Sequence, residues 1–206
     1  VKKSKFAHTT IMKNTPVHYG LLLTAITLIL FFAVYYFFIG FDYYIISVGV
    51  NVFALPAIYT LITIILLYKK TNIEKLSFAK NFQYSFVTMF LGGTVSYLLI
   101  ALFFNFVDQD AQSLLQHQRL ERNLENLYAE YQSLKEPTEE QTASYNEYVK
   151  SLTSESVRNE RLFGLKNSFI ILGILYLFYL TISVFLSIFF RTRTPNATFN
   201  RHSPAQ

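Results

Sequence analysis

The sequence predicts an all-α, polytopic membrane protein with four transmembrane helices and an extramembrane antiparallel helical hairpin between the third and fourth helices. Three observations predict this fold class. The chain of 206 residues is 52% hydrophobic and 15% charged, whereas an ordinary soluble domain has about 25% charged residues. The apolar residues gather into four uncharged blocks, and a long polar segment with helical periodicity separates the last two. Too little polar sequence remains to cover four such helices in a soluble core.

Each apolar block is long enough to cross a bilayer, whose core of about 30 Å needs roughly 20 residues at 1.5 Å each. The basic leader, residues 1–18, resembles the start of a signal peptide. However, the apolar run after it is too long and has no small-x-small cleavage site, so we expect a retained helix. Tyr and Phe cluster at the block ends, as in aromatic belts. The four predicted spans are residues 19–39, 43–67, 84–107 and 167–190.

The basic residues predict how the chain sits in the membrane. The leader has four Lys and no acidic residue, the connection 68–83 has four Lys against Glu74, and the tail 191–206 has three Arg. Short loops rich in Lys and Arg stay cytoplasmic. Both termini are therefore expected inside, and residues 108–166 outside. The net charge of +5 comes from residues beside the spans, which favours contact with anionic membrane lipids and not with nucleic acid.

The outer segment, residues 108–166, is predicted to form a coiled-coil-like hairpin whose arms continue the third and fourth spans outward. Apolar residues spaced four, three, four and three apart form a heptad stripe on its first arm. Thr138 and Gln141 have the spacing of a capping box that starts the second arm. The stripe either closes the seam between the arms or leaves a surface for a partner, for which Tyr is well suited. The predicted hairpin face is Leu120, Leu124, Leu127, Tyr131, Leu134, Tyr145, Tyr148 and Leu152.

The predicted spans contain no ionisable side chain of Asp, Glu, Lys, Arg or His, and such residues are the usual indication of a transport path or proton relay. Gly92, Gly93 and Ser96 are small residues that let another helix approach closely. Asn51 is the polar residue with the highest cost in lipid, so it needs a partner or a place near the outer interface. Pro56 is expected to kink the second span and to free a carbonyl near Val52.

No pattern in the sequence indicates a catalytic, cofactor-binding or metal-binding site. The four His are scattered, the chain has no Cys, and no Gly-rich phosphate loop or nucleophile elbow occurs. Asp108 and Asp110 are too few for a specified cation site, and we expect them to mark the membrane exit and to cap a helix. The sequence therefore predicts that this protein is not an enzyme.

Three short motifs resemble a known family. They are Tyr19-Gly-Leu at the start of the first span, Leu76-Ser-Phe-Ala-Lys-Asn-Phe82 before the third, and Phe106-Val-Asp108 at its end. Over roughly residues 15–192 the chain resembles a family of small Bacteroidetes membrane proteins catalogued as domain of unknown function 4199. The family pattern has an acidic residue followed by Pro after the third span, where this chain has Gln109. The resemblance implies a bacterial inner membrane with the hairpin in the periplasm, and it implies no activity.

Two functional hypotheses follow. The first is a non-enzymatic subunit or assembly partner of a membrane protein complex, which contacts other membrane or periplasmic subunits through the hairpin and the helix bundle. The alternative is a small homo-oligomeric transporter, channel or lipid-handling protein that uses Asn51, Pro56 and the Gly92–Ser96 face. An accessory subunit of an enzyme that acts on lipid-linked substrates is a third form of the partner hypothesis.

Overall fold

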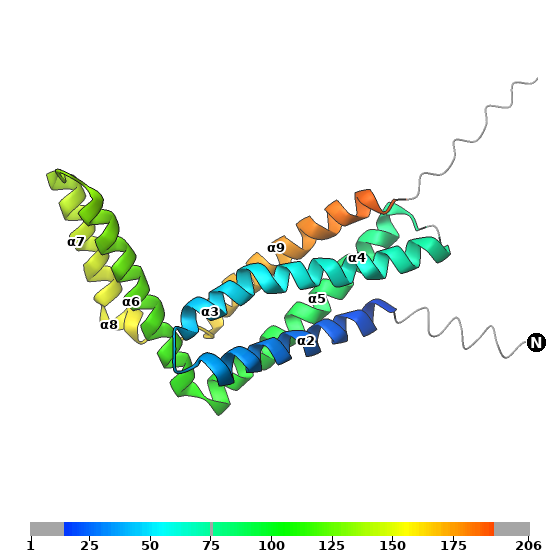
Figure 1. Cartoon of the computed structure of the whole chain (residues 1–206), viewed down its shortest axis with the longest axis horizontal. Helices are drawn as coiled ribbons and strands as arrows, with labels where there is room; N and C mark the ends of the chain where they lie inside the picture. Colours follow the sequence, from blue (N-terminus) through cyan, green and yellow to red (C-terminus); the bar gives the residue numbers. More distant parts are fainter. Residues whose placement is uncertain (1–14, 75, 192–206) are drawn as a thin grey trace, which may run out of the picture.

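The computed structural model describes residues 15–74 and 76–191, and within these ranges it contains helices and short connections but no strand (Figure 1). Four helical stretches are long and apolar enough to span a membrane: Pro16–Phe38, Tyr43–Asn72, Phe78–Val107 and Leu165–Phe189. This confirms the all-helical, multi-pass prediction. Most of the predicted leader and tail lies outside the described residues. The elements are α2 (Thr15–Phe38), α3 (Tyr43–Gly49), η1 (Val50–Ala54), α4 (Leu55–Glu74), α5 (Phe78–Leu102), η2 (Phe103–Val107), α6 (Gln109–Ser133), α7 (Glu139–Thr153), α8 (Glu155–Arg158) and α9 (Leu165–Phe189).

Helix α5 is the centre of the bundle, with α2 and α9 packed against it and α4 in fewer contacts. Its small residues allow this closeness, because Gly92 lies against Leu23 of α2 and Gly93 lies against Tyr179 of α9. Tyr179 in turn stacks on Tyr59 of α4, with ring centroids 5.8 Å apart. The core of the bundle is therefore built from close helix approach together with a few large rings.

The second connection is shorter than the sequence predicted. Helix α4 continues through Lys69 and Lys70 to Glu74, and α5 already begins at Phe78. The expected interfacial run 76–82 therefore forms mainly the first turns of α5. Lysines continue a helix at a membrane boundary because their long stems remain on the apolar surface. Lys70 lies over the ring of Tyr84, 5.8 Å from its centroid, and joins α4 to α5 at this point.

Two π-helical turns occur in the spans, one inside the second span and one at the end of the third. The first, η1, separates α3 from α4 and ends two residues before Pro56, where the N–H of Leu55 bonds to the carbonyl of Val50. Pro56 has no N–H for the carbonyl of Val52, and a wider turn is one way to accommodate that loss. The second, η2, ends the third span at Val107.

The chain changes direction at Asp108, whose extended backbone (φ −138°, ψ 87°) separates η2 from α6. Helices α6 and α7 form a hairpin that runs across the end of the bundle and projects to one side (Figure 1). The arms therefore do not continue the spans outward as predicted. The reason is a buried cluster at this end of the bundle, where Ala111 and Leu115 of α6 pack on Phe104, Val34 and Tyr43.

The return arm also differs from the prediction of one helix running towards Leu162. Helix α7 ends at Thr153, Ser154 is extended (ψ 144°), and the four-residue α8 precedes an irregular stretch, 159–164. Leu162 and Phe163 leave the helical stripe because they pack against the buried cluster at the bundle end. The predicted capping box of Thr138 and Gln141 is confirmed, with both reciprocal bonds present.

Candidate functional site

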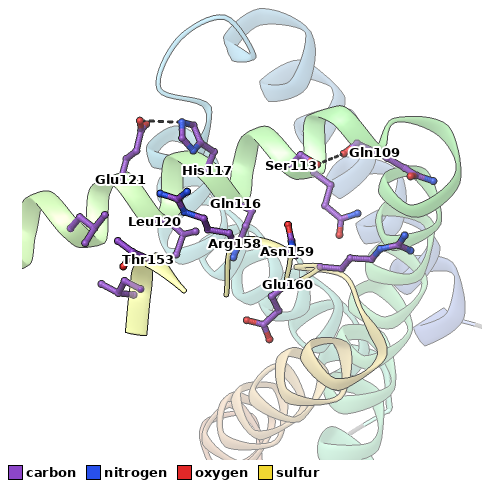
Figure 2. A pocket seen from close by; sticks show the side chains of 14 residues that line it. Gln109, Ser113, Gln116, His117, Leu120, Glu121, Thr153, Arg158, Asn159 and Glu160 are labelled. Carbon is purple, nitrogen blue, oxygen red and sulfur yellow. Dashed lines mark hydrogen bonds and ion pairs between the residues drawn. The ribbon is translucent and has the colours of Figure 1, made fainter. Parts of the chain in front are cut away.

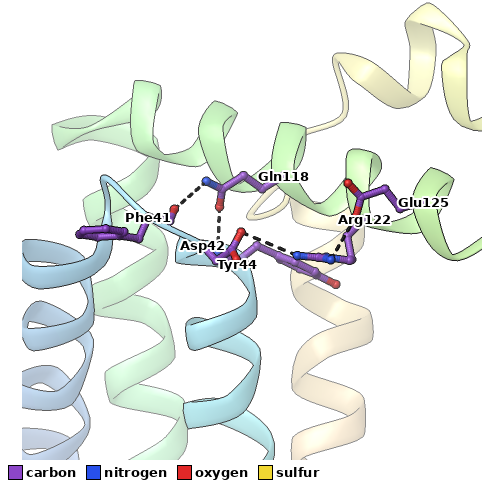
Figure 3. A network of polar contacts seen from close by, with 6 residues as sticks. All are labelled: Phe41, Asp42, Tyr44, Gln118, Arg122 and Glu125. Carbon is purple, nitrogen blue, oxygen red and sulfur yellow. Dashed lines mark hydrogen bonds and ion pairs between the residues drawn. The ribbon is translucent and has the colours of Figure 1, made fainter.

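The best-defined polar site lies where the hairpin crosses the bundle. The side-chain amide of Gln118 donates to the carbonyl of Phe41 at 3.1 Å and accepts from the N–H of Tyr44 at 2.8 Å (Figure 3). Beside it, Arg122 lies 3.7 Å from Asp42 and 3.0 Å from Glu125. One amide and one guanidinium of α6 thus hold the α2–α3 connection, and we call this contact the α6 clamp.

Asp108 strengthens the same junction. Its carboxylate accepts the N–H of Ala111 at 2.9 Å, which caps α6, and it also accepts the hydroxyl of Tyr35. The Tyr35 bond, followed by the backbone bond from Ala111, lowers the pKa of Asp108. Asp108 therefore caps α6, as the sequence predicted, and in addition connects α6 to α2.

A second set of amides holds the return segment against α6. Gln112 is buried and donates to the carbonyl of Phe104 at 3.3 Å, while it accepts the N–H of Phe163 at 3.2 Å. One helical turn further on, buried Gln116 donates to the carbonyl of Val157 at 2.8 Å. Within the described part of the chain, the side-chain oxygen of Gln116 is buried without a bonding partner.

A cleft of about 410 Å³ opens between α6 and this return segment (Figure 2). Leu120, Leu124 and Leu152 supply apolar lining, and His117 pairs with Glu121 at 3.1 Å. Arg158, Glu160 and Arg161 also line the cleft, so both signs of charge are present. In the part of the chain that the structure describes, no group of three or more His, Asp or Glu side chains is placed to hold a metal ion.

The residues of the predicted hairpin face lie in four different environments. Leu120, near the bundle, is buried. Tyr131 and Tyr145 stack across the seam with centroids 4.2 Å apart, and the Tyr131 hydroxyl lies 3.1 Å from that of Thr142. Tyr148 is 63% exposed and is not part of the seam. The remaining members, Leu124, Leu127, Leu134 and Leu152, are partly buried.

Helix packing accounts for Gly92, Gly93 and Ser96. A Cβ on Gly92 would lie 2.7 Å from the Cβ of Leu23, and one on Gly93 would lie 1.9 Å from the Tyr179 hydroxyl. Ser96 bonds to the carbonyl of Gly92 at 2.7 Å, within its own helix. These residues fit α5 closely against its neighbours inside one chain.

Asn51 does not form one surface with these residues. Asn51 is exposed on the outside of the bundle, and its amide donates to the carbonyl of Ser47 at 2.7 Å. Ser96, in contrast, is buried and lies 3.5 Å from the hydroxyl of Tyr59. A single chain therefore does not bring together the Asn51, Pro56 and Gly92–Ser96 set on which the transport hypothesis depended.

Sequence reasoning missed the glutamines that organise the junction. Gln112 and Gln116 are four residues apart and so share a face of α6 directly after a span. This spacing is visible in the sequence and could have indicated them. Their backbone partners at 104, 157 and 163 cannot be read from spacing, because they depend on the turn at Asp108 and on the irregular return segment.

The geometry defines this molecule as a multi-pass helical membrane protein with a helical insertion before its last span. Residues 18–192 match the model of a family described as "Protein of unknown function (DUF4199)". The chain belongs to this family, which confirms the resemblance seen in the sequence. No curated protein and no solved structure matches the chain.

Proposed function

We propose that this protein is a non-enzymatic integral membrane subunit or assembly partner, and that the α6–α7 hairpin is its principal contact surface. One observation carries the proposal: the base of the hairpin is firmly held, whereas its far part is uncovered. Gln118 and Asp108 tie the base to the bundle, yet α7 has no buried residue. A hairpin with a fixed orientation and an uncovered surface is suited to docking, because its orientation is set before a partner binds.

The exposed tyrosines give the far hairpin its recognition chemistry. Tyr128 and Tyr148 are 53% and 63% exposed, and Tyr is enriched at the centres of protein interfaces. They have no part in the Tyr131–Tyr145 stack that closes the seam. Packing of one arm of the hairpin on the other therefore does not account for the rings of Tyr128 and Tyr148.

The charge distribution supports an orientation with both termini in the cytoplasm of a bacterial cell and residues 108–166 in the periplasm. Lys69, Lys70 and Lys80 lie at the end of the bundle opposite the hairpin. Residues 108–166 carry seven basic and eleven acidic side chains, a net charge of 7 − 11 = −4. Lys and Arg favour the cytoplasmic side, and anionic inner-leaflet lipids would be partners there.

The orientation can be tested directly because the chain has no Cys. In spheroplasts, Tyr148→Cys should react with a membrane-impermeant maleimide, whereas Lys80→Cys should react only after permeabilisation. Both side chains are exposed, so a difference in labelling reports sidedness. The reverse pattern would overturn the proposed orientation.

The docking proposal is tested by shortening the hairpin while keeping its base. Leu124 and Leu152 line the same cleft, so removal of residues 126–150 with a short Gly-Ser turn leaves Gln118, Arg122 and the cleft in place. Proteins that co-purify with the full chain in nanodiscs, identified by mass spectrometry, should be lost from the shortened variant. Retention of the same proteins, with the helical circular dichroism of the bundle unchanged, would show that the hairpin is not the docking surface.

The cleft favours a second candidate function, a homo-oligomeric transporter, channel or lipid-handling protein. It combines apolar lining from Leu120 with the charges of Arg158 and Glu160, a mixture that suits an amphipathic molecule at a membrane surface. Replacement of Arg158 by Gln should then lower flux or lipid transfer in liposomes. Equal rates for both proteins would remove the cleft from any such mechanism.

A further inference from the structure

Two arginines line the cleft at the base of the hairpin without a carboxylate partner. In the part of the chain that the structure describes, neither Arg158 nor Arg161 lies within ion-pair distance of an acidic side chain. The carboxylate of Glu160 accepts an amide N–H from α9 at 3.1 Å and points away from α6 (Figure 2). The other acidic residue of the lining, Glu121, pairs with His117. The charge that remains without a partner in the cleft is therefore positive.

Gln116 adds a hydrogen-bond acceptor to the same cleft. Its side chain lines the cleft and is 4% exposed, and its amide nitrogen donates to the carbonyl of Val157 at 2.8 Å. Its oxygen is buried and accepts no hydrogen bond from any residue that the structure describes. A buried acceptor without a donor is unfavourable, and an occupant of the cleft with a hydroxyl group would supply the missing donor.

One wall of the cleft leads directly into the last span. The N–H of Gly164 bonds to the carbonyl of Arg161 at 3.0 Å, so a single tight turn separates this arginine from Leu165, where α9 begins. Leu165 and Phe169 are 83% and 75% exposed, on a helix that is apolar enough to span a membrane. A lipid whose polar end lies in the cleft can therefore leave its acyl chains on the surface of α9.

The size of the cleft and its side chains define the class of ligand. A volume of about 410 Å³ is in the lower part of the range for small-molecule pockets, which suits a headgroup and leaves acyl chains outside. Guanidinium groups donate paired hydrogen bonds to phosphate oxygens. The free acceptor of Gln116 requires a hydroxyl on the same molecule.

We propose that the cleft binds the phosphoglycerol headgroup of a phospholipid in the leaflet on the hairpin side. Arg158 and Arg161 hold the phosphate, and Gln116 accepts a glycerol hydroxyl. The proposal deepens the lipid-handling candidate, on which it rests for the use of this cleft, by naming the ligand. It requires neither transport of the lipid nor a protein docked on the hairpin.

The absence of Trp from the chain allows a direct test, because a single introduced Trp is quenched by lipids with brominated acyl chains. Leu165→Trp places this reporter beside the cleft. Phe37→Trp is the matched control, since Phe37 is 75% exposed at the end of the first span and does not line the cleft. In phosphatidylcholine bilayers, Leu165→Trp in the full-length protein should report about tenfold preference for brominated phosphatidylglycerol over brominated phosphatidylcholine. Phe37→Trp should report little preference.

Substitutions of the arginines in the Leu165→Trp protein separate a site from general attraction to basic residues. Arg158→Gln and Arg161→Gln should each lower the preference about threefold, and both side chains are exposed, so helical circular dichroism should not change. Lys166→Gln removes a charge at the same membrane boundary but not from the cleft lining, and it should leave most of the preference. Equal losses in the three variants, or equal preference at both Trp positions, would overturn the proposal.

Two further comparisons test the identity of the ligand. Brominated phosphatidic acid has the phosphate but no headgroup hydroxyl of glycerol, so it should quench Leu165→Trp less than phosphatidylglycerol does. Equal quenching would overturn the phosphoglycerol assignment. Displacement of the lipid by millimolar glycerol phosphate at constant ionic strength would identify a soluble phosphate ester as the ligand, which would also overturn the proposal. The lipid-handling candidate fails separately, because an absence of lipid transfer with the preference intact would remove transfer and keep the site.

Discussion

Two helical regions of this molecule are held together in different ways. One is the part of the bundle where α2 and α9 pack on α5, and the other is the far part of the α6–α7 hairpin. In the bundle, backbones meet at Gly92 and Gly93, and no added atom fits without a shift. In the far hairpin, α7 has no buried residue, and the main cross-seam contact is the Tyr131–Tyr145 stack. The structure of the bundle therefore depends on the close fit of its helices. The hairpin depends on specific contacts at its base, and its far part should tolerate substitutions. Four predictions test this difference, from the largest expected effect to the smallest.

The largest effect is expected from Gly92→Ala. The new Cβ would lie 2.7 Å from the Cβ of Leu23 and 3.2 Å from the carbonyl oxygen of Gly20, so α2 and α5 must separate. Overpacking of this kind costs about 2–3 kcal/mol, measurable as a shift in SDS-induced unfolding followed by circular dichroism. Gly173→Ala is the control, because a Cβ there meets nothing within 4 Å. Equal effects of the two variants would contradict the close-fit account of the bundle.

The next effect is expected at the base of the hairpin from Gln112→Met. This side chain keeps the length of Gln but leaves the N–H of Phe163 and the carbonyl of Phe104 without their side-chain partner. Unpaired buried groups cost about 1–2 kcal/mol. Gln109→Met should change little, because the Gln109 side chain is exposed and its one bond is a local one, to the carbonyl of Asn105 four residues earlier. A stable Gln112→Met protein would show that the return segment is held by other contacts.

A smaller effect is expected from Asp108→Ala, which removes the cap of α6 and the Tyr35 bond. Loss of an N-cap costs about 1 kcal/mol. Because the pKa of Asp108 is lowered in the fold, its contribution is present above the ordinary carboxyl pKa and is lost as pH falls through the lowered value. The stability difference between wild type and Asp108→Ala should therefore shrink in acid. A double-mutant cycle with Tyr35→Phe measures the coupling, and strict additivity would argue against the bond.

The smallest effect is expected from Tyr148→Ser in the far hairpin. The side chain is 63% exposed, and such surface substitutions change the free energy of unfolding by less than about 0.5 kcal/mol. Tyr145→Ser should cost more, about 1 kcal/mol, because it removes the aromatic pair with Tyr131. If Tyr148→Ser were the more destabilising of the two, the far hairpin would not be the tolerant region described here.

The sequence by itself determined the elements whose causes are local. Long uncharged runs define four spans, the heptad stripe defines α6, and Thr138 with Gln141 defines the start of α7. Each of these elements depends on composition or on spacing along one helix, so it can be predicted without knowing which distant residues it contacts. The family match over residues 18–192 agrees with the short motifs at the span ends.

Only the tertiary structure decided how these elements meet. The turn at Asp108 directs α6 across the bundle because Ala111 and Leu115 gain burial against Phe104 and Tyr43. The glutamine contacts of α6 with the α2–α3 connection and the return segment follow from that turn. Likewise, Asn51 is equally polar in any arrangement of the spans, but the rotation of α3 and η1 within the bundle turns it outward. Such outcomes depend on contacts between residues far apart in the chain, which spacing along one helix does not encode.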